Sequence, residues 1–286
     1  MTALDRWREE LGSWRIPDAI LAAAPEPPWG FPTELFRRRA ASAAAEAAEP
    51  TPTVRRAQEA LPIGGSILDV GCGGGATSLP LAGRVGEVVG VDGQADMLRA
   101  FLEAAESAGV KATAVRGTWP EAGPEVGATD VVVCGHVLYN VAEAGPFVDA
   151  LTLHARRRVV VEITGTHPMS WMHDLWERFY GVARPSGPTA EDAAAAIRQT
   201  GVEPRREART ATDDHPAGGG FERREDAVAL VRRRLCLPAE RDDEIEAALG
   251  DRLRERGGLW SAGPRDQELV TLWWDGEAAR SPTTQS

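Results

Sequence analysis

The sequence predicts an α/β protein with a doubly wound, mostly parallel sheet. From residue 61 onward, short β-branched apolar runs alternate with helix-prone segments, and such alternation implies a parallel sheet with helices on both faces. A glycine-rich turn follows the first of these runs, where a ligand-binding loop between a strand and a helix is expected. The 286 residues suffice for one large domain or for a core with a cap.

Hydrophobic pattern and chain punctuation place the elements in order. Seven strands are expected, at 66–70, 87–91, 111–115, 129–134, 158–163, 202–209 and 268–274. Helices are expected at 77–83, 95–107, 145–154, 169–180, 190–200, 225–235 and 240–256, and a further helix-prone stretch covers 35–48.

The same pattern divides the chain into four parts. Residues 1–60 are expected to form a helical N-terminal cap. This region is not one continuous helix, because the proline-rich stretch at 24–32 interrupts it. Residues 61–210 and 266–276 form the core. Residues 211–265 are a helical insertion before the last strand, expected to act as a lid or substrate subdomain, and the small, polar tail at 277–286 is expected to be disordered.

The glycine-rich turn suits a nucleotide-like ligand. Gly71 and Gly73 follow a buried strand, and a helix starting near Thr77 is expected to point its N-terminus at the ligand. The spacing Gly71-x-Gly73-x-x-Ala76 also satisfies the relaxed dinucleotide fingerprint, with Asp92 about 20 residues further on. The glycines alone therefore leave two cofactors open.

Asp69 separates these two interpretations. It lies two residues before the first glycine, where a dinucleotide-binding strand is usually apolar and where a carboxylate would repel a pyrophosphate. S-adenosylmethionine has no phosphate, and a carboxylate favours its sulfonium and ammonium groups. The run Asp69-Val-Gly-Cys-Gly-Gly-Gly75, together with Asp92, resembles the class I S-adenosylmethionine-dependent methyltransferases over roughly residues 61–163.

The resemblance implies a Rossmann-like, seven-stranded fold and S-adenosyl-L-methionine as cofactor. It implies that glycines pack against the cofactor, that Asp92 binds both ribose hydroxyls, and that Thr118 and Trp119 lie beside adenine, although Thr118 replaces an acid common in the family. The implied cofactor-binding residues are Asp69, Gly71, Cys72, Gly73, Asp92, Gly93, Thr118, Trp119, Cys134 and Gly135.

The loop after the fourth strand is implied to face the reactive methyl group. His136 is the candidate general base, because imidazole exchanges protons near neutral pH, and Tyr139 and Asn140 are candidates for orienting an acceptor. Methyl transfer needs mainly alignment, so such side chains are optional. The alternative is that His136 and Asn140 cap the next helix or anchor the loop.

We expect a methyltransferase that acts on a small molecule at oxygen, nitrogen or carbon by in-line displacement. An RNA or protein methyltransferase is the second hypothesis, and it requires Arg205, Arg206 and the arginines at 232–234 to converge beside the cofactor cleft. An NAD-dependent oxidoreductase and a non-catalytic cofactor-binding protein are further alternatives. The identity of the acceptor and the oligomeric state stay open.

Bulk properties exclude several classes. The formal charge of −11 argues against nucleic acid and anionic membranes as partners. No apolar stretch approaches the roughly 20 residues that span a bilayer, and the first residues lack a signal pattern, so a cytoplasmic location is expected. His167, His173 and Asp174 lack a standard ligand spacing, so no metal is expected.

Overall fold

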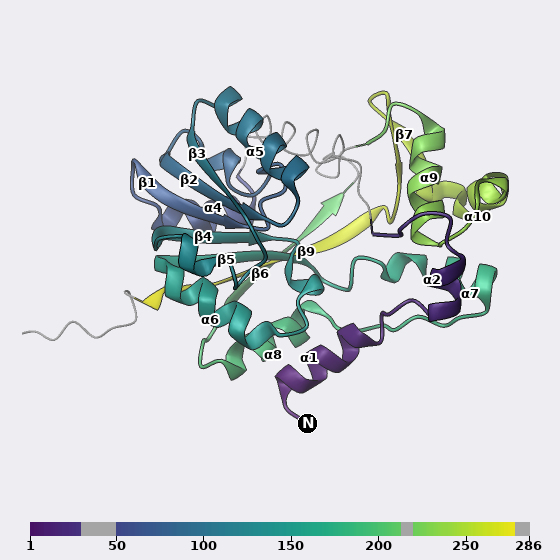
Figure 1. The fold of residues 1–286 in the computed structure, drawn as a ribbon, viewed down its shortest axis with the longest axis horizontal. Coiled ribbons are helices and arrows are strands. Elements are labelled where there is room, and N and C mark those ends of the chain that lie inside the picture. The colour runs from purple at the N-terminus through teal and green to yellow at the C-terminus, as the bar shows by residue number, and fades with distance from the viewer. Residues whose placement is uncertain (30–49, 213–219, 278–286) are drawn as a thin grey trace, which may run out of the picture.

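A computed structural model describes residues 1–29, 50–212 and 220–277. Its main feature is a seven-stranded sheet of order β3-β2-β1-β4-β5-β9-β6 (Figure 1). The strands are β1 (Gly65–Val70), β2 (Val85–Asp92), β3 (Lys111–Arg116), β4 (Thr129–Gly135), β5 (Ala155–Thr164), β6 (Arg205–Thr212) and β9 (Asp266–Asp275). All seven predicted strands are confirmed.

The first five strands are parallel, and β9 lies antiparallel between β5 and β6. The sheet is therefore mostly parallel, as predicted, although its last two strands are separated along the chain by the insertion. One register row crosses the sheet with Glu162 opposite Thr271 and Thr271 opposite Glu207. Glu162 and Thr271 of this row become part of the candidate site.

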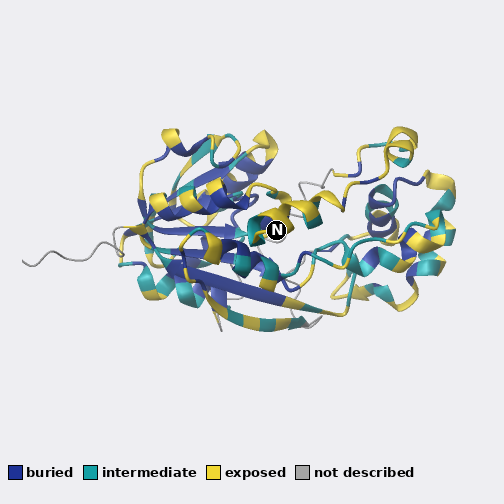
Figure 2. Cartoon of the chain, turned by 90° about the horizontal axis from the view of Figure 1, so that it is seen from below, coloured by how far each residue is buried: buried dark blue, intermediate teal, exposed yellow. Residues whose placement is uncertain are grey.

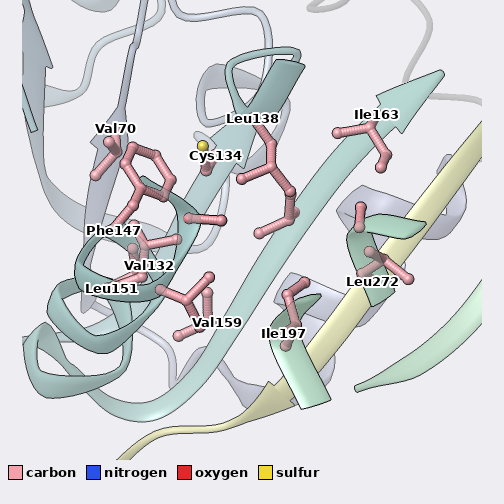
Figure 3. Packing of buried hydrophobic residues seen from close by; sticks show 14 of the residues in the cluster. Val70, Val132, Cys134, Leu138, Phe147, Leu151, Val159, Ile163, Ile197 and Leu272 are labelled. Carbon is pink, nitrogen blue, oxygen red and sulfur yellow. The ribbon is translucent and has the colours of Figure 1, made fainter. Parts of the chain in front are cut away.

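Two apolar layers cover the sheet because residues along each strand alternate between its faces. Val131 and Val133 of β4 pack with α4 (Pro52–Ala60) and α5 (Ala95–Ser107), whereas Val132 and Cys134 face the opposite layer. That opposite layer is formed by α6 (Ala144–His154), α8 (Ala190–Gln199) and α1 (Ala3–Gly12). Figure 3 shows its packing, with Phe147 and Leu151 against β4 and β5 and Ile197 beside Leu272.

A third apolar cluster lies outside the sheet and has its own buried centre. It joins residues from α7 (His173–Tyr180), α9 (Arg224–Arg234) and α10 (Asp242–Leu249) with Ile16, and Ile20 of α2 (Asp18–Ala23) packs against it. We call residues 14–28, 169–180 and 221–262 the outer subdomain; it lies to the right of the sheet in Figure 1 and contains buried residues of its own in Figure 2. The N-terminal region is thus divided, with α1 on the core and α2 on the outer subdomain.

Two predicted helices differ from the structure. Residues 77–83 form turns and one 3-10 helix, Leu79–Leu81, because Pro80 offers no amide hydrogen and Gly83 follows closely. The α-helix ends at Leu249: Gly250–Arg252 form a 3-10 helix, and the chain then enters the hairpin of β7 (Leu253–Arg256) and β8 (Leu259–Ala262). The hairpin turn, Gly257-Gly258, has positive φ at both residues, as a two-residue type I′ turn requires.

The other predicted helices are present with small shifts in their bounds. The helix-prone stretch at 35–48 and the tail from 278 lie outside the described residues. The insertion contains a hairpin as well as helices. Across the described ranges, the structure contains no helix with the length and apolar character that a membrane span needs.

Candidate active site

The glycine-rich turn is hydrogen-bonded to the end of β2. The backbone N–H groups of Gly71 and Cys72 both donate to the Val91 carbonyl, at 2.8 and 3.1 Å. Gly71 has a φ of +69°, and a Cβ atom there would lie 2.3 Å from Val137 Cγ2. A side chain at this position would therefore be strained and would collide with the loop after β4. Only glycine lets the turn and that loop approach so closely.

Asp92, the acid at the carboxyl end of β2, faces this turn. Its Oδ2 accepts a hydrogen bond from the Gly73 N–H at 3.1 Å, and its Oδ1 accepts one from the Gln94 N–H at 2.9 Å. The side chain is partly exposed, and Gly93 beside it has open space where a Cβ would be. The carboxylate is thus held in place while a ligand can still reach it.

Asp69 lies beneath the turn and is 0% exposed. Its Oδ2 accepts a hydrogen bond from the Ser78 hydroxyl at 2.6 Å, but its Oδ1 has no hydrogen-bond partner among the residues that the structure describes. Burial, opposed by the bond from Ser78 and assisted by the charge of Asp92, raises the pKa of Asp69 to about 7. A nearby positive charge would stabilise the ionised form of this acid.

These features fit S-adenosylmethionine better than a dinucleotide. Two acids, Asp69 and Asp92, surround the turn, and a buried carboxylate oxygen still lacks a partner. Within residues 71–84 there is no α-helix whose N-terminus could stabilise a pyrophosphate. The arrangement therefore favours a ligand that carries positive charge and hydroxyl groups.

Other predicted cofactor residues lie at the same edge of the sheet or close to it. The Thr118 hydroxyl donates to Glu121 Oε2 at 2.9 Å, and the Trp119 indole is 9% exposed and packs edge-on against His154. Cys72 and Cys134 are buried, which raises the pKa of both thiols. A Cβ at Gly135 would lie 2.2 Å from Thr77 Oγ1, so the end of β4 touches the segment after the glycine turn.

The loop after β4 is rigidly held. The His136 N–H donates to the Glu162 carbonyl at 2.7 Å, and the Tyr139 hydroxyl donates to the Thr164 carbonyl at 2.9 Å. From α1, Trp7 Nε1 donates to the Val141 carbonyl at 2.8 Å. Burial raises the pKa of Tyr139, and its ring stacks on Trp7. Tyr139 therefore anchors the loop, whereas the Asn140 side chain is exposed.

His136 has a strained backbone, with a φ of +59°. The left-handed region costs a residue with a side chain about 1–2 kcal/mol, and such strain often accompanies function. Its ring is 47% exposed, and Nε2 lies 3.2 Å from Glu162 Oε1. Neither the 3-10 helix Leu138–Asn140 nor α6 has a side-chain cap at its N-terminus, so His136 caps neither of the helices that follow it.

Glu162 is a largely buried polar residue to which the sequence prediction assigned no role. Its side chain is 14% exposed, and its Oε2 accepts a hydrogen bond from the Thr53 hydroxyl at 2.5 Å; that hydroxyl is also 2.7 Å from the Thr271 hydroxyl. Burial would raise the pKa of Glu162, but the contacts with His136 and Thr53 and the charge of Arg209 lower it to about 2. Glu162 is therefore ionised at neutral pH. Its position at the end of β5 was the available signal.

A cavity of about 280 Å³ lies where the chain leaves β5 for the outer subdomain and returns to β9. The residues that line it include Thr166, His167, Ser170, Trp171 and Glu268. Burial, together with the charges of Arg184 and His173, lowers the pKa of His167 to about 4. The His167 ring is therefore neutral at neutral pH.

The arginine runs do not form one open basic surface. Arg232 and Arg233 both pair with Glu26, and Arg232 also pairs with Asp242 at 2.7 Å. On β6, Arg205 pairs with Asp275 at 3.8 Å and Arg206 with Glu268 at 3.3 Å. Both runs are largely neutralised by acids, and the α9 run is partly buried inside the outer subdomain.

Comparisons with known proteins agree with this geometry. Residues 67–160 match the family model described as a methyltransferase domain. Over 157 residues the chain is 32% identical to a ubiquinone biosynthesis O-methyltransferase from Methylobacterium nodulans, a match that covers 48% of this chain and 62% of that protein. Over 81 residues it is 38% identical to the protein of the same name from Azorhizobium caulinodans, covering 28% and 32%.

A solved structure shares the fold. The crystal structure of a candidate methyltransferase from Bacillus halodurans superposes with a TM-score of 0.51 at 16% identity, covering 79% of this chain and 99% of that chain. The match of residues 67–160, together with the sheet order, identifies a class I S-adenosylmethionine-dependent methyltransferase domain in this chain. The chain spans less than two thirds of the length of the two curated relatives.

Proposed function

We propose that this protein transfers a methyl group from S-adenosylmethionine to a hydroxyl group of a small molecule. The observation that carries this proposal is the position of His136, a half-exposed imidazole at the carboxyl end of β4 beside the glycine turn. The cofactor supplies an electrophilic methyl group when bound. The chain then has to bind and align two ligands and to accept the proton of the hydroxyl group.

The cofactor-binding roles follow from charge and position. Asp92 is suited to accept hydrogen bonds from two ribose hydroxyls, since its carboxylate is already oriented by two backbone N–H groups. Asp69 would favour the positive charge of the cofactor, which its unpartnered Oδ1 supports. Gly71 and Gly73 give the close approach, and the Thr118–Trp119 segment would lie beside adenine. Glu121, bonded to Thr118, places an acid near that position.

The acceptor is proposed to be small. The cavity beside β5 and β9 has the volume of a small ligand, about 280 Å³, and its hydroxyls and its neutral His167 suit a hydroxylated compound. The two curated relatives are named as O-methyltransferases of ubiquinone biosynthesis. The ion pairs of Arg232 and Arg233 with Glu26 argue against RNA as the methyl acceptor.

The test has two stages. Isothermal titration should first detect binding of S-adenosylmethionine and S-adenosylhomocysteine, while NAD gives no heat. Radiolabelled methyl transfer is then measured to a panel of hydroxylated aromatic compounds, with total RNA and a protein extract in parallel. We expect label in the small molecules, and about a 100-fold lower rate for His136→Ala if it is the base.

Two results would reject the proposal. If NAD binds and S-adenosylmethionine does not, the glycine turn is a dinucleotide-binding turn. Label that appears in RNA or protein but in no small molecule would establish the second hypothesis. Glu143→Gln is the matched control for His136→Ala, because it alters an exposed side chain at the end of the same loop that has no proposed role; if both variants lose the same activity, His136 has no special role.

A further inference from the structure

We propose that Glu162 is a positioning residue for His136: it holds the imidazole proton on Nε2 and so leaves Nδ1 as the atom that accepts the proton of the acceptor. This inference rests on the proposed function and adds a residue to it. Glu162 lies on β5, one strand away from the loop that carries His136, and the two residues are joined through both main chain and side chain.

The tautomer follows from the chemistry of the contact. His136 Nε2 lies 3.2 Å from Glu162 Oε1, and an ionised carboxylate has no hydrogen to donate. A hydrogen bond across this contact therefore requires the proton on Nε2. In the neutral ring the lone pair is then on Nδ1, and the ring keeps an open side because it is 47% exposed.

The carboxylate is itself fixed by two further elements. Thr53 at the start of α4 donates to its second oxygen at 2.5 Å, and Thr271 on β9 lies 2.7 Å from the Thr53 hydroxyl. Burial opposes ionisation, but the contacts with His136 and Thr53 and the charge of Arg209 outweigh it and bring the pKa of Glu162 to about 2. A charged, immobile acceptor at this place orients the ring more strictly than a mobile one.

The backbone of His136 supports the same geometry. Its φ of +59° places the residue in the left-handed region, and its N–H is bound to the carbonyl of Glu162 at 2.7 Å. The strained turn thus directs the ring toward the carboxylate of the residue that also holds its main chain. An extended conformation at His136 would break this two-point attachment.

The proton balance is complete with these groups. As the acceptor oxygen forms its bond to the methyl carbon, the sulfur–carbon bond breaks and S-adenosylhomocysteine leaves as a neutral thioether. The O–H electron pair stays with the acceptor oxygen, and the proton passes to His136 Nδ1. The imidazolium formed is stabilised by the Glu162 carboxylate and later loses its proton to water.

The test reads the tautomer directly. With five histidines in the chain, ¹⁵N–¹H correlation spectra of the imidazole rings, assigned with His136→Gln, show which nitrogen of His136 carries the proton at high pH. In the wild-type protein we expect it on Nε2. In Glu162→Gln we expect the ratio of the Nε2–H to the Nδ1–H form to fall by about tenfold, because a charge-assisted hydrogen bond is lost.

The matched control is Glu207→Gln. Glu207 lies in the same register row, pairs with Arg55 and Arg56 of α4, and has no contact with His136 in the part of the chain that the structure describes. We expect this variant to keep the wild-type tautomer. A wild-type proton on Nδ1 would overturn the proposal even if Glu162→Gln does not fold, and so would an unchanged ratio in Glu162→Gln or an equal change in Glu207→Gln.

This test is separable from that of the proposed function. Tautomer spectra need neither cofactor nor acceptor, whereas the proposed function fails when S-adenosylmethionine does not bind. In titrations with S-adenosylhomocysteine, Glu162→Gln should bind with wild-type affinity, because Glu162 is assigned to the base and not to the cofactor. A loss of more than about tenfold in this affinity would make Glu162 part of the cofactor site and would overturn its assignment to the base.

Discussion

Replacing Asp69 by asparagine should remove a large pH dependence of stability. The carboxyl group is 0% exposed, and its pKa is raised from 3.8 to about 7 in the folded protein. Between these two values the folded protein keeps a proton that the unfolded chain has released. The contribution of Asp69 to stability is therefore most favourable below pH 4 and falls as the pH rises to 7.

The magnitude follows from the size of this window. One pKa unit corresponds to 1.36 kcal/mol, so a window of roughly three units gives a loss of about 4 kcal/mol between pH 4 and 7. A typical domain has a free energy of unfolding of only about 5–15 kcal/mol. The effect should therefore be visible without any ligand.

The assay is urea unfolding of the ligand-free protein at pH 4.5 and pH 8. Between pH 4.5 and pH 8, the free energy of unfolding of Asp69→Asn should fall by about 3 kcal/mol less than that of the wild type. Its absolute stability is not diagnostic, because the amide introduces a buried donor. Asp130→Asn is the control. Burial raises the pKa of Asp130, but hydrogen bonds from Ser66 outweigh this and lower it. Asp130 therefore changes stability only below about pH 4. Equal pH dependence in wild type and Asp69→Asn would refute the reasoning.

Three further outcomes are expected. Asp92→Ala should weaken S-adenosylhomocysteine binding by about 2–4 kcal/mol in calorimetric titration, since two hydrogen bonds to a charged group are lost; unchanged affinity in a folded variant would contradict its assignment. Gly71→Ala should lower the melting temperature clearly, because its Cβ would collide with Val137, whereas Gly127→Ala, with nothing within 4 Å, should not. Trp7→Phe should cost about 1–2 kcal/mol in urea unfolding by removing the bond to the loop after β4; the wild-type midpoint would exclude that anchor.

Local pattern was sufficient for most elements of the core. The β-branched runs at 66–70 and 129–134 are buried on both faces and were found as strands for that reason. The helix expected at 77–83 failed because a single proline outweighed the periodic pattern. The hairpin at 253–262 was missed although Gly257-Gly258 is a recognised turn signal, because the flanking residues are helix formers.

The candidate site was predicted only in part. The structure brings Asp69, Gly71 and Asp92 together at one turn, as expected from their spacing along a strand, a turn and a second strand. Glu162 was not assigned a role, since its partner Thr53 is separated from it by 109 positions. Tyr139 was expected to face a substrate, but its hydroxyl is bound to the Thr164 carbonyl.

The sequence alone determined the α/β class, the succession of strands along the chain and the glycine turn with its two acids, because these depend on residues near one another in the chain. Only the tertiary structure brought Thr53, His136, Glu162 and Thr271 into one hydrogen-bonded group, since that group needs α4, the end of β4, β5 and β9 to meet. It also decided that the arginines of α9 are paired inside the outer subdomain. Long-range packing sets which polar groups meet and which are withdrawn from water, and no local pattern encodes that choice.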